Sequence, residues 1–366
     1  MGGSGGTEQS NGIHDRLLDG GAGPGARTLV VILDGTLGSL DPGRSTNAGR
    51  IFRLLLDLPP VLRPSVFYEE GIQWTNWRDV RDVITGRGIN PQIRRAYGFL
   101  ASHYRPGDRV FFFGYSRGAF AVRSLAGLID RIGLIKPRFA REPMIQQVWK
   151  RYRTDPHGEH AKVFARKFCQ TDLTIQMVGV FDTVKALGWR LPGLRAMSEK
   201  EHAFHSHHLG NRVRRGFHAL ALNETRVAFE PVMWESRPDW HGHVEQVWFR
   251  GNHSDVGGQL TGFNKARPLS NIPLVWMLEN AEACGLPLPD GWRDRFPQDA
   301  TAPSCGGWRG WGMLFAHRRR RRVGRDPSER LHPSALARAP ASAAALPLVE
   351  WDPGDDFTPP GTAAPG

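Results

Sequence analysis

A serine stands between two glycines directly after a run of apolar residues, in the stretch "FFFGYSRGAF" at 111–120. Residues 114–118 fit the pattern G-x-S-x-G, which places a nucleophilic serine on a sharp turn between a strand and a helix. The helix N-terminus would add partial positive charge near the serine alkoxide. The alternative is a serine that only caps the helix. Because the sequence predicts a strand before Ser116 and a helix after it, we favour the nucleophile.

A serine hydroxyl is a weak nucleophile at neutral pH and therefore needs a base. Asp182 follows the apolar run "MVGVF", and His253 follows "VEQVWFRGN". The chain order serine, aspartate, histidine is that of α/β-hydrolases. His253 would take the proton of Ser116 and return it to the leaving group, while Asp182 would orient the imidazole. Turn or cap roles are the alternatives for both residues, and Asp255 is either a second candidate acid or a brace for the loop "NHSDVGG".

Backbone N–H groups must stabilise the oxyanion, and the sequence offers two places for them. One N–H is expected from Arg117, which follows the nucleophile. The second is expected from Gly35 or Thr36, in the loop after the predicted strand, with Asp34 as a supporting residue. The stretch "DGT" also occurs in haloacid-dehalogenase phosphatases, whose nucleophilic aspartate lies two residues earlier. That position holds Ile32 here, which cannot form an aspartyl-phosphate, so we reject this interpretation.

Short apolar runs that alternate with helical patterns must position these residues. Buried strands are predicted at 28–36, 109–115, 174–183 and 244–253. Helices are predicted before and after the second of these strands and at 272–286. This order indicates an α/β fold, of the α/β-hydrolase-like three-layer type, with a mostly parallel central sheet. Sites in such sheets gather beyond the carboxyl ends of the strands, where Asp34, Ser116, Asp182 and His253 all fall.

Composition excludes several other kinds of site. The three cysteines, Cys169, Cys284 and Cys305, are too few and too widely spaced for a disulfide framework or a zinc site. The histidine-rich stretch at 202–208 is more typical of a polar surface helix than of a metal site. His218 is more typical of a packed or capping histidine than of a catalytic one. We therefore expect no cofactor and no metal.

The formal net charge is +12, and much of the excess lies in "HRRRRRVGR" at 317–325. We interpret this run mainly as solvated charge. Its alternative role is peripheral contact with an anionic membrane surface. This charge is the only feature that would favour a nucleic-acid partner, and no recognition motif accompanies it. We therefore expect no nucleic-acid partner. The sequence shows no secretion signal and no run of about 18 apolar residues, so we expect a cytoplasmic protein in the producing cell.

The chain divides into three parts by composition. Residues 1–26 are rich in glycine and polar residues and are expected to be a disordered tail. Residues 27–337 are expected to form one α/β-hydrolase-like domain. Residues 338–366 are rich in proline and alanine and are expected to be a second disordered tail.

Six blocks in this order resemble the DUF2235 family of α/β-hydrolases, which includes the Tle1-type phospholipase effectors of type VI secretion. The blocks span about 27–287 and include "ILDGT", "GDRVFFFGYSRGAFAVRSLAG", "VGVFDTVKALG", "FHALALNETRVAFEPVMWE", "VEQVWFRGNHSDVGGQL" and "LSNIPLVWMLENAEACGL". Ser116 matches the family's "GFSRGA" serine, Asp182 its "WDTVG" aspartate, and His253 its "HSDVGG" histidine. The resemblance implies an esterase or phospholipase activity and export by a type VI-like route without a signal peptide.

Two function classes follow from these observations. The leading hypothesis is a serine hydrolase that cleaves carboxylic esters, phospholipids above all, through a Ser-His-Asp triad and an acyl-enzyme. The alternative is a binding or scaffold protein that keeps the hydrolase fold without its chemistry. The presence of all three residue types in the right order favours the enzyme, because binding alone does not require them.

Overall fold

The computed structural model describes residues 25–36, 38, 40–41, 43–71, 89–170, 172–184, 208–307, 317–338 and 341–349. Every structural statement below concerns these residues. The two expected tails lie largely outside them, as do residues 202–207 of the histidine-rich stretch.

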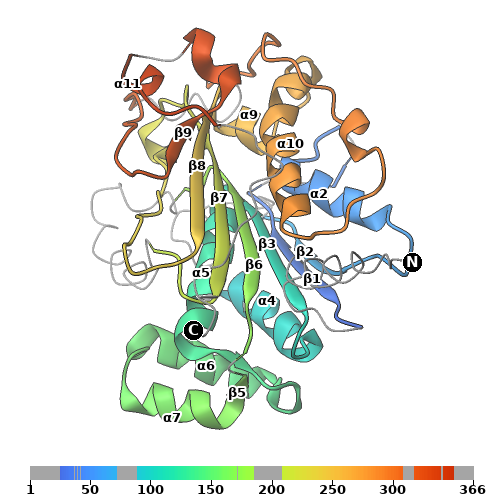
Figure 1. The fold of residues 1–366 in the computed structure, drawn as a ribbon, viewed down its shortest axis with the longest axis vertical. Helices are drawn as coiled ribbons and strands as arrows, with labels where there is room; N and C mark the ends of the chain where they lie inside the picture. The colour runs from blue at the N-terminus through green and yellow to red at the C-terminus, as the bar shows by residue number, and fades with distance from the viewer. Residues whose placement is uncertain are drawn as a thin grey trace, which may run out of the picture.

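A seven-stranded sheet with strand order β2-β1-β3-β6-β7-β8-β9 forms the centre of the molecule (Figure 1). Each neighbouring pair of its strands is parallel. A two-stranded antiparallel sheet, β4-β5, lies apart from it. The strands are β1 (Thr28–Leu33), β2 (Ser65–Glu69), β3 (Arg109–Tyr115), β4 (Leu134–Ile135), β5 (Cys169–Gln170), β6 (Ile175–Phe181), β7 (Val213–Ala221), β8 (His243–Phe249) and β9 (Glu329–Leu331).

α-Helices follow β1, β2, β3 and β8 and form crossovers between parallel strands, whereas the segment between β7 and β8 contains one 3₁₀ turn. The α-helices are α2 (Asn47–Leu56), α4 (Ile89–His103), α5 (Ser116–Ile132), α6 (Glu142–Thr154), α7 (Glu159–Phe168), α9 (His253–Gly257), α10 (Arg267–Ala283) and α11 (Ala341–Ala344). Short 3₁₀ turns are η1 (Pro137–Phe139), η3 (Val227–Phe229), η4 (Asn264–Ala266), η5 (Trp292–Arg295) and η7 (Pro333–Arg338).

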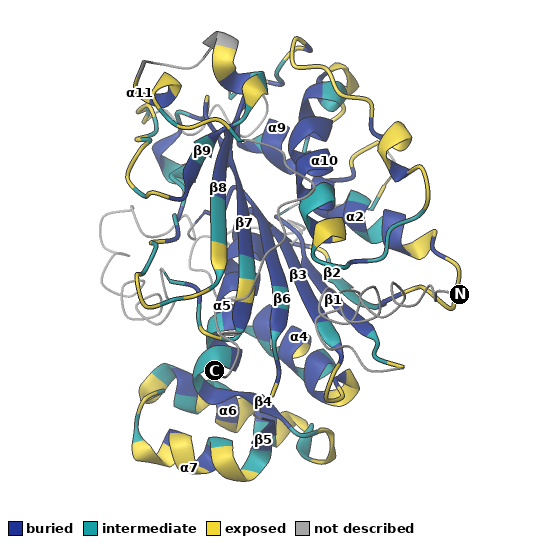
Figure 2. Ribbon diagram, viewed as in Figure 1, coloured by how far each residue is buried: buried dark blue, intermediate teal, exposed yellow. Residues whose placement is uncertain are grey.

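Alternation along β1 shows how the sheet is covered on both faces. Leu29, Val31 and Leu33 pack into a core with α4 and α5, whereas Val30 and Ile32 pack into a second core with α2 and α10. All five side chains are fully buried, and Figure 2 shows the central strands of the sheet largely in the dark blue of buried residues. A strand buried on both faces must be apolar throughout, which explains the run "TLVVIL". The predicted three-layer α/β architecture with a mostly parallel sheet is confirmed.

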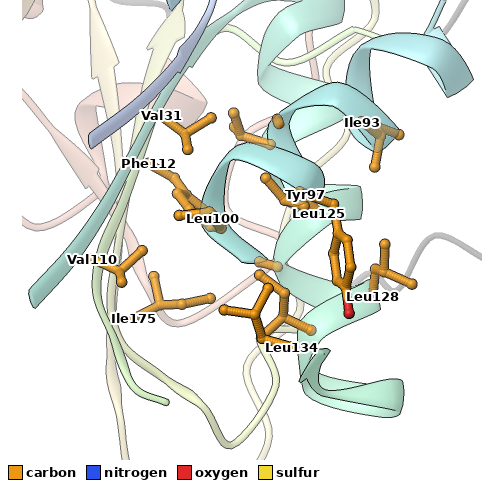
Figure 3. Close-up of a cluster of buried hydrophobic side chains, with 14 of the residues drawn as sticks. Val31, Ile93, Tyr97, Leu100, Val110, Phe112, Leu125, Leu128, Leu134 and Ile175 are labelled. Carbon is orange, nitrogen blue, oxygen red and sulfur yellow. The ribbon is translucent and has the colours of Figure 1, made fainter. Parts of the chain in front are cut away.

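Figure 3 shows part of the core between the sheet and α4. Phe112 of β3 and Leu100 of α4 lie in it, each fully buried. Tyr97 is also fully buried, but its hydroxyl donates to the carbonyl of Gly133 (2.8 Å) and accepts from the N–H of Ile135 (2.9 Å). Since a buried hydroxyl is tolerated only when it is hydrogen-bonded, these bonds allow the ring to fill the core.

The strand order reverses at β1. From β1 the chain goes to β2 on one side and to β3, β6, β7 and β8 on the other. The loops after β1 and β3 therefore leave the sheet in a position where α/β proteins bind ligands. Gly35 follows β1 and Ser116 follows β3 at this edge.

The structure contains elements that the sequence analysis did not predict. In the body of the chain these include α2, β2, β4, β5, α6, α7, β7 and β9. Within the segment expected to be a tail, Ala343 is buried in α11 and Leu348 pairs with Leu331 of β9. The alanines favour a helix, and Leu346, after the helix, packs against the apolar cluster that contains Ala343. Among the described residues, no helix combines the length and hydropathy that crossing a membrane requires.

Candidate active site

Ser116 lies on a tight turn that only small neighbours permit. Its φ is 56°, in the left-handed region that β-carbon-bearing residues rarely adopt. A Cβ on Gly118 would lie 2.0 Å from the carbonyl oxygen of Leu33, and one on Gly114 would lie 2.7 Å from the Cα of Ala119. The two glycines of the G-x-S-x-G pattern therefore allow β1, β3 and α5 to pass at contact distance.

The structure brings Ser116, His253 and Asp182 together at the carboxyl edge of the sheet. His253 Nε2 lies 2.9 Å from Ser116 Oγ, and His253 Nδ1 lies 2.6 Å from Asp182 Oδ2. The three residues are 7%, 3% and 0% exposed, respectively. With its proton on Nδ1, the imidazole donates to the carboxylate and accepts from the hydroxyl, which is the geometry of a serine nucleophile with its base and acid.

Asp182 is itself held on a strained turn. Of the three non-glycine residues with positive φ in the described part of the chain, two are Ser116 and Asp182 (φ 41°). Such strain costs on the order of 1–3 kcal/mol per residue and clusters at functional sites. The N–H of Ala221 donates to Asp182 Oδ1 (3.0 Å), so the end of β7 fixes the carboxylate.

Arg321 is a partner of Asp182 that the sequence did not identify. Its guanidinium donates to both carboxylate oxygens, at 2.5 Å and 2.8 Å, and its side chain is 4% exposed. The same guanidinium donates to the carbonyls of Ala221 (2.8 Å) and Phe229 (2.6 Å). One arginine of the basic run is therefore buried against the acid of the site, contrary to the expectation that the run is mainly solvated.

The pKa values of the pair follow from burial and these contacts. Burial raises the pKa of Asp182, but the charge and hydrogen bonds of Arg321, with the hydrogen bond of His253, outweigh it and hold the pKa well below its ordinary value. Burial lowers the pKa of His253, and Asp182 opposes this only in part. His253 is therefore neutral at pH 7, as a general base must be.

Two aromatic rings flank the His253 imidazole. The ring centroids of Tyr115 and Phe229 lie 4.9 Å and 4.8 Å from that of the imidazole. The backbone N–H of His253 donates to the carboxylate of Glu224 (3.2 Å), which also forms an ion pair with Arg226 at 2.6 Å. The stretch "NETR" thus helps to fix the backbone of the general base, a role that the sequence of charges alone does not indicate.

Asp255, the second candidate acid, faces a different group. It accepts from the N–H of Asn252 (2.9 Å) in the capping box of α9. It also accepts from the hydroxyl of Ser304 (2.5 Å) and the N–H of Cys305 (2.9 Å). These contacts make it a brace for the loop that carries His253, and Asp182 alone of the two acids contacts the imidazole.

The candidate oxyanion donors lie on either side of Ser116. Arg117 is the second residue of α5, so its N–H belongs to the first turn of the helix. Gly35 lies against the nucleophile, since a Cβ placed on it would be 3.2 Å from Ser116 Cβ. The N–H of Gly35 donates to Asp34 Oδ1 (2.6 Å), however, which leaves Thr36 as the better candidate in that loop.

Asp34 anchors the loop after β1. Besides Gly35, its carboxylate accepts from the hydroxyls of Thr46 (2.6 Å) and Tyr68 (2.8 Å). Burial raises the pKa of Asp34 to about 6, although all three hydrogen bonds act to lower it. Ile32, the position a phosphatase would need for its nucleophile, is buried in the core.

Two other histidines that the structure describes, His218 and His208, contact neighbouring protein groups. His218 is fully buried on β7 and accepts from the N–H of Thr183 (3.1 Å), and burial lowers its pKa to about 3. His208 contacts Glu235, with 3.6 Å between His208 Nε2 and Glu235 Oε2. Within the described ranges, no group of three or more His, Cys, Asp or Glu side chains could hold a metal ion.

Residues 27–280 match a family described as "T6SS, Phospholipase effector Tle1-like, catalytic domain". The chain is 26% identical over 238 residues to the uncharacterized protein YEL023C of Saccharomyces cerevisiae, a match that covers 58% of this chain and 33% of the yeast protein.

Two solved structures are also similar. One is an uncharacterized protein from Pseudomonas aeruginosa, with 16% identity and a TM-score of 0.41 over 80% of this chain and 53% of that one. The other is the Tle1 effector bound to the VgrG spike of the type 6 secretion system, with 18% identity and a TM-score of 0.31 over 64% of this chain and 51% of that one. The chain thus spans about a third to a half of the length of these relatives.

Proposed function

The chain belongs to the family of Tle1-like catalytic domains of T6SS phospholipase effectors, and from this premise we propose that it is a serine hydrolase that cleaves the carboxylic esters of phospholipids. The observation that carries the proposal is the pair of hydrogen bonds that joins Ser116 to His253 (2.9 Å) and His253 to Asp182 (2.6 Å). The family supports the lipid substrate, and the hydrogen bonds support the mechanism.

In the first half of the proposed reaction, Ser116 Oγ attacks the ester carbonyl carbon while His253 Nε2 takes the hydroxyl proton. The carbonyl oxygen becomes an oxyanion, which the N–H groups of Arg117 and Thr36 stabilise. The C–O bond to the leaving alcohol then breaks, and His253 returns the proton to that alcohol. Ser116 keeps the acyl group as an ester.

In the second half, water replaces the alcohol. His253 takes a proton from the water, whose oxygen attacks the acyl carbon, and the bond to Ser116 Oγ breaks as the proton returns to the serine. The products are a fatty acid and free enzyme. Asp182 stays ionised throughout, because Arg321 stabilises its negative charge, and holds the imidazole in the tautomer that both halves need.

The cellular setting is part of the same proposal. We place the protein in the cytoplasm of the producing cell before export by a type VI-like route, as the family implies. At its target the net charge of +12 would favour contact with an anionic membrane surface.

Hydrolysis of phospholipid vesicles tests the proposal. The wild type should release fatty acid and lysophospholipid, and Ser116→Ala should lose at least three orders of magnitude of this rate, the scale on which triads act. Ser124→Ala is a matched control on the same helix, because Ser124 only donates to the carbonyl of Phe120 (2.7 Å). Equal turnover by the wild type and Ser116→Ala would refute the mechanism, and no turnover by either would favour a non-catalytic scaffold.

A further inference from the structure

A pocket of about 200 Å³ lies between α2, with the residue Ser45 before it, and the segment after α10. Figure 1 shows α2 beside α10 in this part of the molecule. A water occupies roughly 30 Å³ in the liquid, so the pocket has room for a group of several heavy atoms. Its lining residues are Ser45, Arg50, Arg53, Leu54, Arg295 and Phe296.

Positive charge in this pocket exceeds the negative charge around it. Arg50 and Arg53 have no carboxylate within ion-pair distance among the described residues, and Arg295 pairs with Asp57 (2.5 Å). A fourth guanidinium, that of Arg267, donates a hydrogen bond to the backbone carbonyl of Ser45 (3.2 Å). Burial, followed by the charge of Arg53, lowers the pKa of Arg50. Arginines gathered in this way are the usual recognition groups for phosphate.

Several buried polar atoms around the pocket lack a protein partner. Ser45 is 1% exposed, and its hydroxyl has no hydrogen bond. Arg50 Nε and Arg267 Nη1 are also buried atoms without a hydrogen-bond partner. A buried polar atom without a partner is costly, and it points to a bound group that supplies the missing bonds. A phosphate oxygen accepts from hydroxyl and guanidinium donors alike, so a phosphate suits the Ser45 and Arg50 side chains that line the pocket.

The pocket lies on the same edge of the sheet as Ser116. Ser45 precedes Thr46, whose hydroxyl donates to Asp34 (2.6 Å). Asp34 precedes Gly35, which lies against Ser116. A short series of contacts therefore connects the pocket with the candidate active site.

We propose that this pocket is a phosphate-binding site, and that the phosphate belongs to the headgroup of an anionic phospholipid. Binding of the phosphate group stands on the pocket alone, whereas its lipid source rests on the proposed function. A lipid held here would orient the carboxyl edge of the sheet toward the membrane, so that the ester substrate reaches Ser116 from the same surface.

Calorimetric titration with inorganic phosphate tests the site. The wild type should bind phosphate saturably, and Arg50→Gln/Arg53→Gln should bind it at least tenfold more weakly. Arg138→Gln/Arg141→Gln is the matched control, since both arginines are exposed beside α6 and the double variant removes the same charge. Circular dichroism verifies folding. Absence of saturable binding by the wild type, or equal weakening in the control, would overturn the site.

Ser45→Ala separates a binding hydroxyl from a packing one. Without phosphate, the variant should melt at or above the wild-type temperature, because it removes a buried hydroxyl that has no partner. With phosphate, it should bind several-fold more weakly than the wild type. A lower melting temperature together with unchanged phosphate affinity would refute the role of this hydroxyl.

Vesicle flotation with Ser116→Ala protein, which prevents turnover, identifies the source of the phosphate. Three results together would support a lipid headgroup. The protein should bind phosphatidylglycerol vesicles more strongly than phosphatidylcholine vesicles, inorganic phosphate should compete with this binding, and Arg50→Gln/Arg53→Gln should abolish it. Phosphate binding without this vesicle dependence would overturn the lipid source in favour of a soluble phosphate ester. Failure of the wild type to hydrolyse any ester would contradict the proposed function while leaving phosphate binding by the pocket intact.

Discussion

Arg321→Gln should impair both the stability and the chemistry of the protein. The guanidinium forms two hydrogen bonds with Asp182, which is fully buried, and two more with backbone carbonyls. Removal of one partner of a buried ion pair costs about 3–5 kcal/mol, because the other charge stays buried. A domain is stable by only about 5–15 kcal/mol, so the melting temperature should fall markedly. Activity assays should therefore be carried out well below the melting temperature of the variant.

The effect on catalysis comes through the orientation of the imidazole. Without Arg321, Asp182 retains one backbone donor and His253, so its carboxylate can rotate. A shift of about 1 Å in a catalytic group costs on the order of 100-fold in rate. We expect kcat for a soluble ester to fall about 100-fold with little change in KM, since Arg321 does not touch the substrate.

The pH profile separates a charge effect from an orientation effect. Arg321 places a positive charge near His253, which disfavours the imidazolium. Its loss raises the pKa of His253, so the imidazole is neutral only above a higher pH. The acid limb of kcat/KM should therefore move to higher pH. Arg321→Lys keeps the positive charge but loses the bidentate hydrogen bonds to Asp182. It should therefore lower kcat without shifting the acid limb of the kcat/KM profile.

Arg320→Gln is the matched control, because this neighbour in the basic run is exposed and its loss removes the same charge. It should leave kcat and the profile unchanged. The reasoning would be refuted if Arg321→Gln stayed within threefold of the wild type in kcat, or if Arg320→Gln matched its loss.

Three further perturbations have defined outcomes. Asp34→Asn should remove a titration: since burial raises the Asp34 pKa to about 6, protonation should stabilise the wild type relative to the variant by about 2.4 kcal/mol as the pH falls from 7 to 4 in urea unfolding, and a constant difference would contradict this. Gly118→Ala should lower the unfolding free energy by about 3 kcal/mol or more, because its Cβ meets a β1 carbonyl at 2.0 Å, while Gly43→Ala, in open space, should change it by less than about 0.5 kcal/mol. Glu224→Gln should cost about 3 kcal/mol at pH 7. That difference should shrink as the pH falls from 4.5 toward the lowered pKa of about 2, and a pH-independent difference in thermal melts would count against the buried pair.

The sequence predicts the centre of the fold because the buried strands are apolar on both faces. The runs that become β1, β3, β6 and β8 were identified for this reason, and their order implied parallel pairing. Once the strands are parallel, their carboxyl ends meet, so Ser116, Asp182 and His253 could be expected to converge. The hydrogen bonds between them depend on two strained backbone turns that no spacing rule specifies.

The parts that sequence reasoning missed depend on contacts between distant residues. Within five consecutive arginines, nothing distinguishes Arg321, which is selected by Asp182 far away in the chain. β7 was hidden by His218, a polar residue in the middle of a strand, which is tolerated because Thr183 and Gln246 contact its two ring nitrogens. The pocket arginines come from α2 and from the segment after α10, and only the fold brings them together.

Covalent labelling with a fluorophosphonate tests the central claim most directly, because the probe reacts with a serine only when a base activates it. Intact-protein mass spectrometry should show one added phosphonyl group on the wild type, mapped to Ser116, and none on Ser116→Ala. Labelling of His253→Ala should be slower by at least 100-fold. A folded wild type that stays unlabelled, or one labelled equally fast without His253, would contradict the account.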